Sequence, residues 1–234
     1  MKLNIKEILD FFDGIKDSQK GDANAVMSIL GEDLNAASYA HFQGSNLKIL
    51  NDSVLPVLLS SIYPGKQIHK RLDRWLVDEN HKRLYQCEIK NCAATAIGGK
   101  KLESDANNEK VKTVTSYHWN REQKNFFSKK ATQPNNVSKV LLPMRPPVGY
   151  KNFRIEPLLI YWMPISSDIK GLNPLSFITN FPFRTSFSKL QIFSVSLYFR
   201  VLLNNGKKYI DLDMPHFEHR IKILNKLQKN KLTL

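Results

Sequence analysis

The sequence predicts one mixed α/β domain that spans residues 1–234, with a C-terminal β-hairpin and helix added to its core. Three observations favour this class. Apolar residues recur at helical spacing near the N-terminus, short runs of β-forming residues follow from about residue 68, and 42% of the 234 residues are hydrophobic, which suffices for one buried core. The sequence contains no internal repeat that would indicate a second unit.

Two helices are expected at the N-terminus. The first covers residues 4–14, and the second follows the break at Gly21-Asp22 and continues to about Tyr39. An apolar stretch over 50–62 then leads into a region of short strands.

The middle of the chain is expected to build a sheet around one helix. Residues 68–77 and 84–90 have the composition of two strands joined by a polar turn, and a basic amphipathic helix is expected over 108–128. Two further strands are expected at 137–142 and 157–163. The proline-rich segment between them is expected to be a loop, because proline lacks a backbone donor.

The C-terminal part shows a second hairpin pattern. Apolar and polar residues alternate over 193–201, which is typical of a strand with one buried face. Asn205-Gly206 favours a tight turn into a partner strand over 209–212, and a final basic helix is expected from about His216.

The charge pattern indicates a polyanionic partner. Lysine and arginine number 35 against 21 acidic residues, for a net charge of +14. Residues 1–64 carry 5 basic and 8 acidic side chains, residues 65–130 carry 15 and 8, and residues 131–234 carry 15 and 5, so the excess lies in the middle and at the end. A lysine-rich surface that favours solubility is the alternative interpretation.

The same composition predicts the compartment. The N-terminus lacks the apolar core of a signal peptide, and no run approaches the roughly 18 apolar residues of a membrane span. Only Cys87 and Cys92 occur, too few for a disulfide framework or a four-thiolate zinc site. We expect a cytoplasmic protein that does not contact a membrane.

The expected hairpin brings two carboxylates together. If its two-residue turn lies at Asn80-His81, residues whose numbers sum to 161 pair across the strands, and Asp73 with Glu88 is such a pair. Strand alternation places Lys90 on the same face as Glu88. Carboxylates with Cβ atoms about 5 Å apart repel unless a cation binds them, and Mg²⁺ prefers such oxygen ligands.

These residue types suit metal-assisted hydrolysis of phosphodiesters. The metal ion would lower the pKa of a bound water, and Lys90 would orient that water or stabilise the charge that develops on the phosphate. The alternative interpretation is an ordinary ion pair between Glu88 and Lys90 on an exposed sheet face.

An acid on one strand followed by Glu-x-Lys on the next resembles the motif of the PD-(D/E)xK, or restriction-endonuclease-like, nuclease superfamily. The motif here is Leu72-Asp73 and Glu88-Ile89-Lys90, with Leu72 in place of the usual proline. The segment Gly31-Glu32-Asp33-Leu34-Asn35-Ala36-Ala37 also resembles the G-E-x-x-A helix segment of several branches.

The resemblance implies a restriction-endonuclease-like core over about 22–142, with a central mixed β-sheet flanked by helices. It does not extend beyond residue 145, and we expect residues 150–234 to form a C-terminal elaboration of that core. It implies that Asp73 and Glu88 bind Mg²⁺, or Mn²⁺ in its place, and that the backbone carbonyl of Ile89 joins them. Lys90 would act on the attacking water. Glu32 is the expected third metal-binding acid, with Asp33 as its rival.

The expected function is a Mg²⁺-dependent nuclease, an endonuclease of defence or repair, that hydrolyses DNA with Asp73, Glu88 and Lys90 as catalytic residues. DNA is favoured over RNA as the partner, and the sequence leaves a homodimer or a protein partner open. A non-catalytic nucleic-acid-binding module, or an accessory factor with the same fold, is the alternative.

Overall fold

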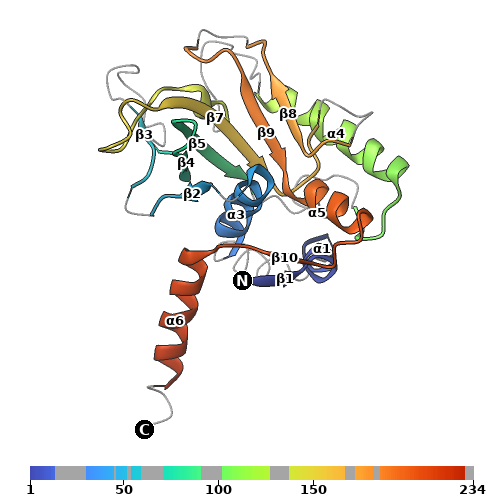
Figure 1. Cartoon of the computed structure of the whole chain (residues 1–234). Coiled ribbons are helices and arrows are strands. Elements are labelled where there is room, and N and C mark those ends of the chain that lie inside the picture. Colours follow the sequence, from blue (N-terminus) through green and yellow to red (C-terminus); the bar gives the residue numbers. More distant parts are fainter. Residues whose placement is uncertain are drawn as a thin grey trace.

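A computed structural model describes residues 1–13, 30–44, 46–51, 54–58, 71–90, 102–126, 137–166, 172–181 and 185–229. These residues form a mixed α/β structure around a six-stranded sheet (Figure 1). The strands, in spatial order, are β2 (Leu47–Ile49), β4 (Arg74–Asp78), β5 (Arg83–Lys90), β7 (Arg154–Tyr161), β9 (Leu190–Ser194) and β8 (Leu175–Ile178). The expected mixed sheet flanked by helices is confirmed.

The strand directions follow from the connections. A short turn joins β4 to β5, and these two strands pair antiparallel, as do β2 with β4. The connection from β5 to β7 is long and contains helix α4 (Asn108–Phe126). Such a crossover allows β5 to pair parallel with β7. Strand β9 continues the parallel part, and β8 is antiparallel to it. Strand β5 is therefore central, with neighbours on both sides.

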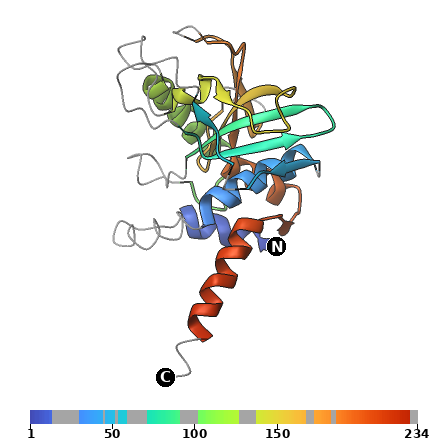
Figure 2. The same ribbon diagram turned by 90° about the vertical axis from the view of Figure 1, so that its left-hand side faces the viewer.

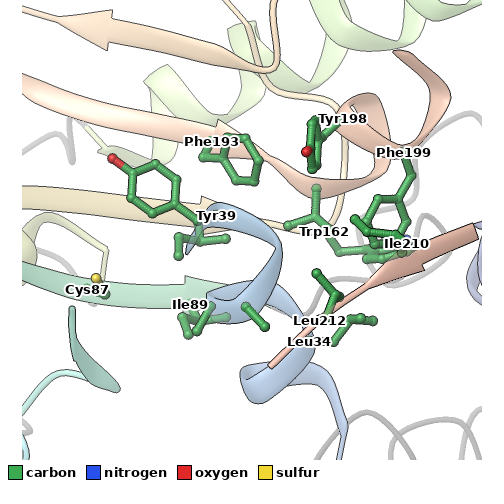
Figure 3. Packing of buried hydrophobic residues seen from close by; sticks show 14 of the residues in the cluster. Leu34, Tyr39, Cys87, Ile89, Trp162, Phe193, Tyr198, Phe199, Ile210 and Leu212 are labelled. Atoms are coloured by element: carbon green, nitrogen blue, oxygen red, sulfur yellow. The ribbon is translucent and has the colours of Figure 1, made fainter. Parts of the chain in front are cut away.

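One face of the sheet packs against three helices: α1 (Ile5–Asp13), α3 (Glu32–Gln43) and α5 (Val195–Asn204). Side chains at alternate positions of β5, Tyr85, Cys87 and Ile89, belong to this core. Figure 3 shows Cys87 and Ile89 on the same side of the sheet as Tyr39 and Leu34 of α3. Cys87 is buried in this core, as its position in the strand predicts.

The opposite face of the sheet has a different cover. Trp75, Val77 and Leu84 pack there against the segment that contains the 3₁₀ helix η4 (Ser138–Leu141). Short strand β6 (Met144–Arg145) follows η4 and pairs with β3 (Val57–Leu58). This face also carries the even-numbered residues of β5, among them Glu88.

Two of the strands expected in the second half of the chain are wrong. Residues 137–142 form η4 rather than a strand. The expected strand over 193–201 ends at Ser194, where the serine hydroxyl accepts a hydrogen bond from the Leu197 N–H and caps helix α5. The alternating pattern led to the wrong prediction of a strand, because this stretch also has apolar residues at helical spacing: Val195, Tyr198, Phe199 and Leu202.

The expected C-terminal β-hairpin is therefore absent from the described residues. Asn205-Gly206 ends α5, with Gly206 at a φ of 79° that suits glycine. The strand that follows, β10 (Tyr209–Asp211), pairs antiparallel with β1 (Lys2–Asn4) and so brings the first residues of the chain beside the segment that precedes α6.

The helical expectations hold more widely. Helices α1 and α4 lie where the apolar spacing predicts them, and the final basic helix is α6 (Pro215–Lys229), which projects away from the sheet (Figure 2). The start of the second expected helix, before residue 30, lies outside the described residues. None of the described helices is long and apolar enough to cross a membrane.

His118 on α4 provides a test of this packing. Its side chain is 1% exposed, and burial lowers its pKa from the usual 6.5 to about 4, with a smaller effect from Arg121. The unfolded chain therefore binds a proton between pH 6.5 and 4 that the folded chain does not, so stability falls as the pH falls through this window.

We expect the free energy of unfolding to fall more steeply with acid in the wild type than in the variant His118→Leu. The difference should reach about 2 kcal/mol between pH 7 and pH 4.5, measured by urea denaturation. Other carboxylates titrate equally in both proteins, so parallel pH curves would show that His118 is not buried in its neutral form.

Candidate active site

The hairpin of β4 and β5 has the register that the sequence predicts. Arg74 pairs with Cys87 and Trp75 with Gln86, so the residue numbers of each pair sum to 161. Asp73 immediately precedes β4 and lies at the position opposite Glu88. Its carboxylate oxygen Oδ2 accepts a hydrogen bond from the Ile89 N–H at 2.7 Å, and its own N–H donates to the Cys87 carbonyl at 3.0 Å. These two bonds fix the half-buried Asp73 carboxylate beside the second half of the motif.

Glu88 is the most enclosed acid of this group. It is 1% exposed, and both of its carboxylate oxygens have a lysine partner. Oε1 pairs with the Lys90 ammonium, and Oε2 lies 2.9 Å from Nζ of Lys139. The structure therefore brings Asp73, Glu88 and Lys90 together, and it adds a second lysine.

The surroundings of Glu88 act on its charge in opposite directions. Burial raises the pKa of the Glu88 carboxyl, and the nearby Asp73 carboxylate raises it further. Lys90 and Lys139 lower the same pKa. A carboxylate that is buried beside another carboxylate thus depends on cations for its ionised form.

Sequence reasoning missed Lys139. This lysine lies in η4, a segment expected to be a strand, and its side chain is only 11% exposed. Its ammonium also donates to the Arg71 carbonyl at 3.1 Å, next to the start of β4. The available signal was that Lys139 directly precedes the apolar run Val140-Leu141-Leu142. A lysine next to such a run can become buried, and a buried lysine requires a partner.

In the described residues, Glu32 and Asp33 form ion pairs with arginines rather than with Lys90 or Lys139. Their position on α3 places them with Arg74, whose guanidinium lies 3.1 Å from Glu32 Oε2 and 3.2 Å from Asp33 Oδ1. Arg220 of α6 lies 3.7 Å from the other oxygen of Asp33. Burial raises the pKa of Glu32, Arg74 lowers it, and the negative charge of the nearby Asp73 raises it again.

Alternation along β4 explains this separation. Arg74 and Asp73 are adjacent in the chain, so Arg74 points to the face covered by α3, while Trp75 and Glu88 occupy the opposite face. Within the described parts of the chain, no three His, Cys, Asp or Glu side chains lie close enough to hold a metal ion. The expected third ligand, Glu32 or Asp33, stays a prediction.

A smaller set of oxygen donors does fit a hard divalent cation. Asp73 and Glu88 supply two carboxylates, and Mg²⁺ is commonly held by one or two carboxylates together with water and phosphate. The N–H of Ile89 points toward Asp73, and the carbonyl of a strand residue lies on the same edge as its N–H. Ile89 can therefore add a third oxygen, provided that a lysine releases Glu88.

The chain matches no protein-family model, curated protein or solved structure among those compared with it. The case for a function therefore rests on the geometry of these residues.

Arg74 should be the most sensitive residue around the site. Its side chain is 4% exposed, and it neutralises Asp33, which is 1% exposed. We expect Arg74→Leu to lower the free energy of unfolding by about 3–5 kcal/mol, because it leaves a buried carboxylate poorly compensated. Urea denaturation measures the loss.

Adding Asp33→Asn to Arg74→Leu should recover at least about 1 kcal/mol, since the double variant no longer buries a poorly compensated charge. As a control, Lys48→Leu removes an exposed pair with Glu79 and should cost at most about 1 kcal/mol. Equal losses in the single and double variants would contradict the role given to the Arg74–Asp33 pair.

Proposed function

We propose that this protein is a metal-dependent nuclease that hydrolyses phosphodiester bonds of DNA, as an endonuclease. The observation that carries the proposal is the β4–β5 register, which sets Asp73 opposite Glu88 with Lys90 on the same face. This is the arrangement that the resemblance to the PD-(D/E)xK superfamily implies.

Each residue has a chemical task in this proposal. Asp73, Glu88 and the Ile89 carbonyl would hold Mg²⁺ or Mn²⁺, which supplies a more acidic water and neutralises negative charge on the phosphate. The hydrogen bond from the Ile89 N–H keeps Asp73 in place for this task. Lys90, 28% exposed at its side chain, lies where its ammonium can orient water or stabilise phosphate charge.

Two further observations support the proposal. Along the chain, helix α3 precedes the motif strands β4 and β5 and helix α4 follows them, all within the core over about 22–142 that the resemblance implies. The net charge of +14 suits a polyanionic substrate.

One observation favours the second candidate function, a nucleic-acid-binding module without catalysis. Both oxygens of Glu88 are already paired with lysines, and such an arrangement can serve stability of the sheet alone. The test must therefore separate binding from cleavage.

The first test is cleavage of plasmid DNA, single-stranded DNA and RNA in Mg²⁺ or Mn²⁺, with EDTA as the metal-free control. We expect metal-dependent cutting of DNA by the wild type. Asp73→Asn, Glu88→Gln and Lys90→Met should each lower the rate by at least about 100-fold, because each removes a group that acts on the metal or the phosphate. The matched variants Glu79→Gln and Lys48→Met, which alter an exposed ion pair, should cut normally.

DNA binding by the same proteins, followed by fluorescence anisotropy at several salt concentrations, separates the two candidates. Binding that weakens with salt, without cleavage in either metal, would replace the nuclease proposal by the binding module. Cleavage that survives Glu88→Gln would place the active site elsewhere.

A further inference from the structure

The charges of the candidate site cancel without a metal ion. Asp73 and Glu88 carry two negative charges, and the ammonium groups of Lys90 and Lys139 carry two positive ones. Glu88 contacts both lysines, one at each oxygen. A divalent cation that binds this pair of carboxylates must therefore compete with the two lysines that already contact Glu88.

Lys139 holds its place through a segment that is itself fixed to the sheet. The Gln86 side-chain amide donates to the carbonyls of Val140 and Leu142, the latter at 2.8 Å, and its oxygen accepts from the Met144 N–H at 3.3 Å. Gln86 and Glu88 lie on the same face of β5, two residues apart. Strand β5 thus holds the η4 segment through Gln86 and pairs with its lysine through Glu88.

Lys139 differs from Lys90 in its surroundings. The Lys90 side chain is 28% exposed and can turn toward water, whereas the Lys139 side chain is 11% exposed and its ammonium is also bonded to the Arg71 carbonyl. A buried ammonium of this kind is costly to move, because it would lose its hydrogen bond to the Arg71 carbonyl and its ion pair with Glu88 without regaining water.

We propose that Lys139 is a positioning residue that occupies one oxygen of Glu88 as a counter-ion and thereby keeps divalent cations from binding tightly to the Asp73–Glu88 pair in the free protein. The proposal rests on the proposed function for its biological meaning. A dication beside two ammonium groups leaves an excess of positive charge, and a substrate phosphate is the anion that offsets it. Lys139 thus couples metal binding to substrate binding.

This role makes an unusual prediction for metal affinity. Loss of a residue that merely stabilises the site would weaken Mn²⁺ binding, whereas Lys139→Met should strengthen it by at least about tenfold, because one repelling charge disappears. Isothermal titration calorimetry of the 234-residue chain with Mn²⁺, in the absence of nucleic acid, measures this affinity directly.

Three variants make the result specific. Lys139→Arg keeps the charge and should bind Mn²⁺ as weakly as the wild type. Lys139→Met combined with Glu88→Gln should lose the gain, since the cation then lacks its buried carboxylate. Lys48→Met removes an equal charge from the exposed pair with Glu79 and should leave Mn²⁺ binding unchanged.

An unchanged or weaker affinity in folded Lys139→Met, with folding checked by circular dichroism, would overturn the inference. If Lys139→Met unfolds, Lys139→Gln repeats the test with a side chain that can still donate to the Arg71 carbonyl. A failure of the nuclease proposal can be distinguished from a failure of this inference. If the wild type cuts no nucleic acid but Lys139→Met gains Mn²⁺ binding that depends on Glu88, the counter-ion role stands and the nuclease proposal is wrong.

Discussion

The pairing of β4 with β5 determines where every group of the candidate site lies. A slip of one residue would turn Glu88 and Lys90 toward the helices and Cys87 and Ile89 toward η4, because side chains alternate along a strand. The buried apolar residues resist this slip, since Cys87 and Ile89 pack in the core below α3. The same hydrophobic packing that stabilises the sheet thus sets the two carboxylates opposite each other.

The polar face of β5 then requires partners of its own. Gln86 and Glu88 are 0% and 1% exposed, and buried polar groups without hydrogen bonds are costly. The segment around η4 meets this need with backbone carbonyls for Gln86 and an ammonium for Glu88. A stretch without regular strand structure is suited to this task, because its backbone groups are not used by a neighbouring strand.

The hairpin and its register could be predicted from sequence because the signals are local: a polar turn, two short strands and a fixed sum of residue numbers. The acids Glu32 and Asp33 could not be placed, since their position depends on which face of the sheet α3 covers. Helix α5 was missed because its apolar residues fit both periods, and the cap at Ser194 decides between them. Lys139 was missed because its contact with Glu88 joins residues far apart in the chain.

The two sets of acids show how neighbouring residues of one strand can serve separate tasks. Arg74 takes Glu32 and Asp33 on the face covered by α3, and its guanidinium also donates to the Asp73 carbonyl at 3.0 Å. That bond ties the ion pairs of Arg74 to the backbone of Asp73. If Glu32 instead faced Glu88, three carboxylates would share one site with two lysines, and a bound dication would leave a smaller excess of positive charge for an additional anion to offset. The change of sheet face between Asp73 and Arg74 therefore influences the charge of the site as well as its geometry.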